Sequence, residues 1–323
     1  MMTAVEEDVK DPDWMERLRS DGNIRLQSLD ACIAGVEGWA SPPGDNFLVR
    51  GPDYFTSRTK VHAGDCLLKS VAFDWIRSSS KISEVLRHPN SRIHAAMKKA
   101  GSSGYGSPPF FWAFNLQVPS KDNYSAIAYF VSMDPIPEDS MMGRFIRGDD
   151  GYRNSRLKLI ANIVNGPWIV RAAVGEQAIC ILGRAVSCKY HHGDNFLEVD
   201  VDIGASILAN AVVHLAFGYV TFLTVDLAFL IESQNDEELP EKLLGTIRFG
   251  NLDPASAVCI DVKEDQHQEG QDGVTVNGSK YSDEPPASSL TGRWWKSFST
   301  YINGEEPPAK ANDNSDSSSS GEG

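Results

Sequence analysis

The chain has 323 residues, of which 41% are hydrophobic and 23% are charged, and its formal net charge is -14. The hydrophobic fraction excludes a wholly disordered chain, and the length allows one large domain or two small ones with a sizeable core. The negative balance argues against a nucleic-acid partner, because a protein that binds nucleic acid needs a concentrated basic surface.

The charge is concentrated at the two ends of the chain. Residues 261–323 carry -7 and residues 1–20 carry -3, which leaves -4 for residues 21–260. The C-terminal end is also polar and of low complexity, so it cannot bury enough apolar surface to offset the entropy cost of ordering. We therefore predict an acidic N-terminal segment (1–20), one domain (21–260) and a disordered acidic tail (261–323).

The N-terminal residues and the cysteines favour a cytoplasmic protein. The first residues are acidic, whereas signal and transit peptides are basic. The five cysteines are odd in number and include no CxxC pair, which is typical of free thiols in a reducing compartment. We expect a cytoplasmic location, with peripheral membrane association as the further option.

The N-terminal third alternates short elements with turns. Residues 11–14 can cap a short helix that runs to about Ser20. A short strand and a turn are predicted at 46–55, and residues 71–76 form a second apolar stretch. Residues 81–99 have the pattern of an exposed amphipathic helix that contains a proline.

The chain then becomes strand-forming. Residues 110–118 and 124–133 are aromatic and β-branched and are separated by turn-forming residues, which predicts a hairpin. Residues 156–164 alternate as a half-buried strand does, and residues 178–189 and 195–203 predict a second hairpin. Consecutive hairpins indicate a single α+β domain with a curved antiparallel sheet.

The last predicted strand has one acidic and one apolar face. Apart from Phe196, one face holds Glu198, Asp200 and Asp202, and the other face is aliphatic. This alternation predicts a sheet with one face in the core and the other in water.

Residues 203–225 form a run of 23 residues without Asp, Glu, Lys or Arg. This length would suffice for a membrane-spanning helix. The acidic flanks, and Asn210 and His214 within the run, argue against a span. We favour a long, nearly all-apolar helix packed across the sheet in a helix-grip-like arrangement, with a helix lying against a membrane as the alternative.

This predicted helix carries a narrow polar stripe that includes Asn210, His214 and Thr221. Two interpretations stay open. The stripe can bond to loops or to backbone groups at the end of the sheet, or it can supply the polar anchors of an apolar ligand pocket between helix and sheet. For the second interpretation, the candidate ligand-binding residues are Asn210, His214, Thr221 and Trp112.

Asp226 lies nearly opposite the polar stripe on the same predicted helix. A buried carboxylate without a partner is strongly destabilising. If Asp226 is buried, we expect it to pair with a cation such as Arg171 or Arg184.

No catalytic signature is present: the sequence has no P-loop, HExxH, GxSxG or kinase motif. Cys188, His191, His192 and Asp194 could suggest a metal cluster, but no second ligand pair follows at a comparable spacing. The four residues also lie at the predicted tip of a hairpin, where such residues commonly form the turn. We expect no metal, no cofactor and no catalytic residue, with an unrecognised enzyme as an alternative.

The tail contains one segment with a different character. Trp294 and Trp295 lie between Arg293 and Lys296 within an otherwise polar stretch. Paired tryptophans flanked by cations suit a membrane interface or a groove on a partner protein. We therefore expect these four residues to contact a membrane or a protein partner, or else to pack back on the domain.

Several separate stretches between Trp39 and Asp253 resemble, in order, the C-terminal domain of the plant Enhanced Disease Resistance 2 family. The resemblance covers about two thirds of the chain. The matching stretches include 36–39, 46–54, 149–160, 166–171, 214–219 and 239–248.

The resemblance implies a regulatory role. In full-length relatives this domain follows pleckstrin-homology and START domains, and those proteins are linked to phosphoinositide binding and to restraint of plant defence and cell death. The two upstream domains are not found in this sequence, so their lipid activities are not implied for it. We predict a non-enzymatic regulatory binding module that responds to a lipid or another apolar ligand. The alternative is a protein-interaction scaffold with a phosphorylatable acidic tail.

Overall fold

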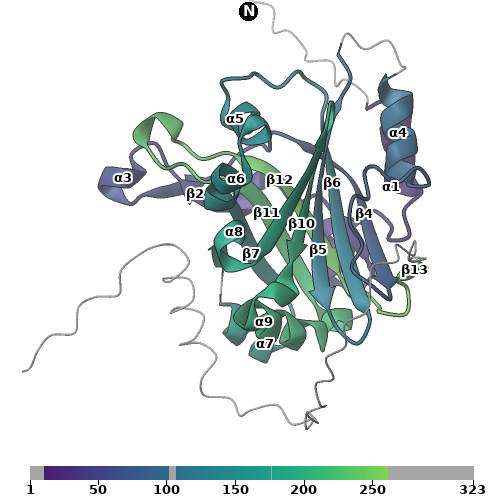
Figure 1. The fold of residues 1–323 in the computed structure, drawn as a ribbon. Helices are drawn as coiled ribbons and strands as arrows, with labels where there is room; N and C mark the ends of the chain where they lie inside the picture. Colours follow the sequence, from purple (N-terminus) through teal and green to yellow (C-terminus); the bar gives the residue numbers. More distant parts are fainter. Residues whose placement is uncertain (1–10, 102–106, 176, 261–323) are drawn as a thin grey trace, which may run out of the picture.

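The fold is built on two β-sheets that pack face to face, with helices on their outside and across one end (Figure 1). The arrangement is that of a computed structural model, which describes residues 11–101, 107–175 and 177–260. The predicted acidic tail (261–323) lies outside the described residues, as do residues 1–10.

The first sheet has five strands in the order β1-β12-β11-β7-β8, and every neighbouring pair is antiparallel. A connection that contains a helix joins β7 to β8, a loop with one 3-10 turn joins β11 to β12, and the pairing of β7 with β11 is long-range. The strands are β1 (Gly38–Ala40), β7 (Leu157–Asn165), β8 (Ala178–Ile181), β11 (Thr224–Ile231) and β12 (Leu243–Gly250).

The second sheet has six strands in the order β13-β4-β6-β5-β10-β9. The pairs β13–β4 and β10–β5 are parallel, and the others are antiparallel. A small third sheet pairs β2 (Leu48–Arg50) with β3 (Lys60–His62). The strands of the six-stranded sheet are β4 (Lys69–Ser78), β5 (Phe110–Pro119), β6 (Asn123–Ser132), β9 (Ser187–Gly193), β10 (Phe196–Asp202) and β13 (Val258–Ile260).

Several helices begin at side chains that accept hydrogen bonds from otherwise unpaired backbone amides. Ser140 accepts from the amide of Gly143 (3.0 Å), and Asp149 accepts from that of Tyr152 (2.7 Å). The helices are α1 (Asp13–Ser20), α2 (Leu29–Ile33), α3 (Tyr54–Ser57), α4 (Arg92–Gly101), α5 (Met141–Arg147), α6 (Asp150–Arg156), α7 (Trp168–Val174), α8 (Leu182–Ala185) and α9 (Ile207–Phe217), with short 3-10 helices η1 (Gly44–Asn46), η2 (Ile203–Ala205), η3 (Val220–Phe222) and η4 (Asp236–Glu238).

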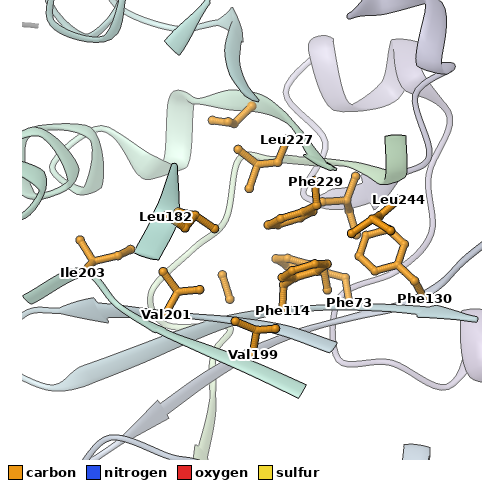
Figure 2. Close-up of a cluster of buried hydrophobic side chains, with 14 of the residues drawn as sticks. Phe73, Phe114, Phe130, Leu182, Val199, Val201, Ile203, Leu227, Phe229 and Leu244 are labelled. Atoms are coloured by element: carbon orange, nitrogen blue, oxygen red, sulfur yellow. The ribbon is translucent and has the colours of Figure 1, made fainter. Parts of the chain in front are cut away.

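The space between the two main sheets is filled unevenly. At one side, aromatic rings from both sheets stack: the ring centroids of Phe114 and Phe229 are 3.8 Å apart with an interplanar angle of 4°. Figure 2 shows these rings beside Phe73 and Phe130, and it shows aliphatic side chains such as Ile203 further along the same space. The aromatic side is therefore closely packed, whereas the aliphatic side is packed less closely and contains a cavity.

The outer faces of both sheets are also covered. Trp14, Met15 and Met97 from α1 and α4 pack on the outer face of the six-stranded sheet. Phe47 and Val49, in and beside β2, pack on the outer face of the five-stranded sheet. Because both faces of both sheets are buried, their central strands have few polar positions.

Much of the predicted architecture is confirmed. The class is α+β, the strands β5 and β6 form the predicted hairpin, β7 matches the predicted half-buried strand, and α1 runs to Ser20. The second predicted hairpin is confirmed only for β9 and β10, because residues 178–185 form β8 and α8 instead.

Three predictions about the architecture are wrong. Two facing sheets replace the single curved sheet. Residues 81–91 contain no helix, and α4 begins only at Arg92. The predicted long helix ends at Phe217, and residues 224–231 form a strand that is buried on both faces. Such a strand is a continuous apolar run, which periodicity alone does not distinguish from a buried helix.

The acidic face of β10 does not face water as predicted. Glu198 is fully buried and Asp200 is 2% exposed, because the segment 79–87 covers this face. Alternation along a strand shows that its two faces differ, but it does not show what lies over each face.

None of the helices in the described part of the chain is long and apolar enough to cross a membrane.

Candidate functional site: an apolar cavity closed by helices

A cavity of about 230 Å³, partly open to solvent, lies on the aliphatic side of the space between the sheets. Every residue that lines it is hydrophobic. Both sheets contribute to its wall, with Leu116, Val118, Ala126 and Val201 from the six-stranded sheet, and Leu159, Ala161, Ile163, Val225 and Leu227 from the five-stranded sheet.

The helix α9 closes one end of this cavity. It follows β10 of the six-stranded sheet and precedes β11 of the five-stranded sheet, so it crosses from one sheet to the other (Figure 1). At its start, Ser206 accepts a hydrogen bond from the amide of Ala209 (3.3 Å). At its end, the ring of Phe217 packs against Tyr124, with the centroids 4.9 Å apart.

The closing elements present one face to the cavity. Helix α7 and the 3-10 helix η3 lie beside α9 and complete the closure. The inner residues are small or branched: Ala209, Val212, Val213, Ala216 and Phe217 from α9, Val174 from α7, and Val220 from η3. We call α7, α9 and η3 together the lid.

The predicted polar anchors do not line this cavity. His214 and Thr221 are exposed, and Asn210 is half-buried, because the inner stripe of α9 is formed by its alanine and valine positions. Thr221 is not in α9 at all but in η3. The polar stripe therefore faces away from the cavity, and a bound molecule would meet only apolar side chains.

Trp112 is also absent from the cavity wall. It is fully buried on the aromatic side of the core, where its ring lies 5.6 Å from that of Phe145 and 5.8 Å from that of Phe114. Its indole Nε1 has no hydrogen-bond partner among the described residues. Trp112 thus fills the core beside the cavity rather than contacting a molecule within it.

The residues of the cavity wall were not predicted from the sequence, because they come from many separate elements. The volume depends on alanines that stand where larger residues would fill the core, and these come from separate elements. They are Ala126, Ala161, Ala178, Ala185, Ala209 and Ala216. No local pattern relates an alanine of one strand to an alanine of a distant helix.

Asp226 is buried and paired, but with neither predicted partner. Arg248, directly opposite it on β12, donates from Nε (2.5 Å) and Nη2 (2.7 Å) to the two carboxylate oxygens. The two side chains are 1% and 5% exposed. Such a two-pronged pair satisfies both charges inside the protein.

Ser83, His191 and Asp200 meet on the outer face of the six-stranded sheet. Ser83 donates to Asp200 Oδ2, and His191 Nε2 lies 3.0 Å from that oxygen and 3.1 Å from Ser83 Oγ. In a catalytic relay, serine and aspartate bind different ring nitrogens of the histidine. Here the same nitrogen faces both, so the arrangement is that of a network holding the segment 79–87 on β10.

Glu198 sits beneath this network. Its two carboxyl oxygens accept hydrogen bonds from the amides of Val85 and Leu86, each 2.9 Å long. Burial, together with the neighbouring Asp200 carboxylate, raises the pKa of Glu198 to about 8. The folded protein therefore holds a proton at Glu198 that the unfolded chain releases at lower pH.

We predict that this proton makes stability depend on pH. The pKa rises from 4.5 in the unfolded chain to about 8 in the fold, so between these values the folded state binds more protons. The free energy of unfolding should thus fall as pH rises through this window, by at most about 1.4 kcal/mol per pH unit. Urea denaturation across the window should show a flatter profile for Glu198→Gln. A Glu138→Gln control, at an exposed position, should keep the wild-type slope, and an equally steep profile for Glu198→Gln would contradict this assignment.

The predicted hairpin tip shows no metal-binding arrangement. Among the described residues, no three His, Cys, Asp or Glu side chains lie close enough together to hold a metal ion. Burial raises the pKa of Cys188 to about 12, so its thiol stays protonated at neutral pH. The predicted contact residues Arg293, Trp294, Trp295 and Lys296 lie outside the described residues.

The fold and its cavity define an α+β domain of two facing sheets with an apolar chamber closed by helices at one end. The chain belongs to the ENHANCED DISEASE RESISTANCE 2 C-terminal family, whose model matches residues 39–253 under the description "Protein ENHANCED DISEASE RESISTANCE 2, C-terminal". The resemblance seen in the sequence is thereby confirmed. The matched range includes every residue that lines the cavity.

One relative gives the scale of the match. Protein ENHANCED DISEASE RESISTANCE 2-like from Arabidopsis thaliana is 39% identical to this chain over 227 residues. The alignment covers 70% of this chain and 30% of the relative. The chain thus spans about 30% of the length of that plant protein.

Proposed function

We propose that this domain is a non-enzymatic binding module that takes up an apolar ligand, such as a lipid acyl chain, in the cavity beneath the lid. The observation that carries the proposal is the cavity itself, which lies between two sheets and is lined by hydrophobic residues throughout the described part of the chain. Apolar chambers of this kind are typical ligand sites in proteins. By its family, we assign the module to the regulators of plant disease resistance.

The size of the cavity suits a small ligand or one segment of a longer ligand. An apolar cavity of about 150 Å³ is known to hold benzene, whereas drug-sized pockets measure about 300–1,000 Å³. The cavity here, at about 230 Å³, lies between these values. It therefore suits a small apolar molecule or a segment of an acyl chain.

The contacts of the wall favour an occupied cavity. Side chains that border an unfilled apolar space lack packing partners on that side. A ligand that fills the space would recover the lost contacts and stabilise the fold.

The chemistry of the wall supports binding rather than catalysis. Of the described residues that line the cavity, only Cys180 carries a titratable group. Burial raises the pKa of this thiol to about 12, so it is protonated and a poor nucleophile at neutral pH. A ligand in the cavity would meet neither an acid nor a base that could act on it.

The proposal is tested on the purified full chain in two steps. Organic extraction followed by mass spectrometry should recover a bound apolar molecule. After extraction, titration with the fluorescent fatty acid cis-parinaric acid should show saturable binding, and the thermal midpoint should rise with added probe. A chain that yields no apolar molecule and does not bind the probe would contradict the proposal.

A further inference from the structure

The most exposed large hydrophobic side chains in the described part of the chain all belong to the lid. Ile207 of α9 is 90% exposed, and Trp168 of α7 and Phe222 of η3 are each 68% exposed. The other exposed large hydrophobic residues reach no more than 45%. Large exposed apolar side chains that gather on neighbouring elements are candidates for an interaction surface.

The strand register brings two of these side chains to the same place. Thr224 at the start of β11 pairs with Asn165 at the end of β7. Phe222 lies two residues before the first, and Trp168 lies three residues after the second. Between them the chain approaches so closely that a Cβ on Gly166 would lie 2.4 Å from a methyl group of Leu223. Trp168 and Phe222 therefore flank one corner of the lid.

The inner face of the lid is apolar, and its outer face carries large apolar side chains beside the polar stripe of Asn210, His214 and Thr221. The inner residues of α9 line the cavity, and Ile207 projects into solvent from the same helix. No residue of α9 is fully buried, although the helix contains no Asp, Glu, Lys or Arg. A helix that is apolar nearly all round belongs either in a core or against a hydrocarbon phase. Here the sheets cover only one face.

The charge of the lid fits an anionic partner. Of the charged residue types, the three lid elements contain only Arg171, in a chain with 44 acids and 30 bases. Arg171 is exposed and forms no ion pair within the residues that the structure describes. It lies three residues after Trp168, on the same face of α7. An apolar surface with a free cation at its edge complements anionic lipid headgroups over acyl chains.

We propose that the lid docks on the surface of an anionic lipid bilayer, with Trp168, Ile207 and Phe222 inserted at the headgroup boundary and Arg171 on a headgroup phosphate. The docking does not require that the cavity hold a ligand, so it stands apart from the proposed function. Where both hold, the lid lies between cavity and membrane, and an apolar ligand can pass between them without crossing water.

Vesicle co-sedimentation of the full chain tests this surface. We expect binding to vesicles of phosphatidylcholine with phosphatidylserine. The variant Trp168→Ser/Ile207→Ser/Phe222→Ser should lose at least about tenfold in affinity, since each serine removes a large apolar side chain that the bilayer would otherwise bury. All three side chains are exposed, so the variant should fold. Unchanged binding of cis-parinaric acid, or an unchanged circular dichroism spectrum, checks that it does.

Two matched controls distinguish binding through this surface from nonspecific adsorption to vesicles. Leu48→Ser/Leu67→Ser/Val258→Ser removes three other exposed hydrophobic residues, which are 40%, 40% and 45% exposed, and it should sediment as the wild type does. Arg171→Glu should weaken binding to the anionic vesicles only, and more strongly at low salt. Its control is Arg147→Glu in α5, near the other end of the sheets (Figure 1).

The proposal is overturned by either of two results. One is a wild-type chain that sediments with neither anionic nor pure phosphatidylcholine vesicles. The other is a lid variant that sediments as the wild type does, which would assign membrane binding to another part of the chain, such as the segment with Trp294 and Trp295.

Discussion

Replacement of Asp226 by alanine is expected to lower the free energy of unfolding by about 3–5 kcal/mol, the range observed when one partner of a buried ion pair is removed. The variant leaves the Arg248 guanidinium inside the protein with one remaining acceptor, the carbonyl of Leu29 at 3.2 Å. A cation without a counter-charge in a poorly solvated site is strongly unfavourable. Urea denaturation of the full chain measures the difference.

Two comparisons isolate the effect of burial. Asp122→Ala removes one partner of an exposed pair with Arg77, 3.6 Å apart, and should cost less than about 1 kcal/mol. The double variant Asp226→Leu/Arg248→Met removes both buried charges and should recover most of the loss. If Asp226→Ala is no more harmful than Asp122→Ala, the pair is not held out of water in the way its geometry indicates.

Asp226 also shows where local pattern reading reaches its limit. The sequence predicts a helix around Asp226 and suggests Arg171 or Arg184 as its partner. In the structure Asp226 lies on β11, and its partner is set by the register of β11 with β12. Asp226 and Arg248 meet only because β11 and β12 pair in this register. No spacing rule in the sequence therefore identifies Arg248 as the partner.

The hairpin of β5 and β6 is the opposite case. The predicted arms 110–118 and 124–133 agree within about one residue with Phe110–Pro119 and Asn123–Ser132. Strand-forming residues and the turn between them are both local, so the sequence determines the element almost alone. By contrast, the parallel pairing of β10 with β5 joins strands that are separated by several other elements.

The candidate site depends on long-range contacts between elements, so local sequence signals do not predict it. Most of the uncharged run 203–225 forms α9, η3 and the start of β11. Of the two interpretations of its polar stripe, the one that makes Asn210 and His214 anchors of a ligand pocket is wrong, because neither residue lines the cavity. A polar stripe indicates a boundary between two environments, and the positions of both sheets decide which side is which.

Substitutions that fill the cavity should raise the stability of the protein and lower its affinity for an apolar ligand. Ala161→Leu on β7 and Ala126→Leu on β6 each add apolar carbons to opposite walls of the cavity. In the extracted protein each variant should gain about 0.5–2 kcal/mol of stability, as cavity-filling substitutions commonly do. Combined in one chain, they should weaken binding of cis-parinaric acid at least about tenfold, because leucine and ligand compete for the same space.

This reversal of sign distinguishes an occupied chamber from an ordinary packing defect. Ala95→Leu, on the exposed side of α4, adds the same carbons outside the cavity and should change neither quantity. A double variant that gains stability and still binds the probe as the wild type does would place the ligand elsewhere on the protein. A double variant that loses stability without added ligand would mean that the walls cannot accept the added volume, and the cavity would then be smaller than a ligand needs. Gain of stability with loss of binding is the combination expected only where a ligand occupies the space between the two sheets.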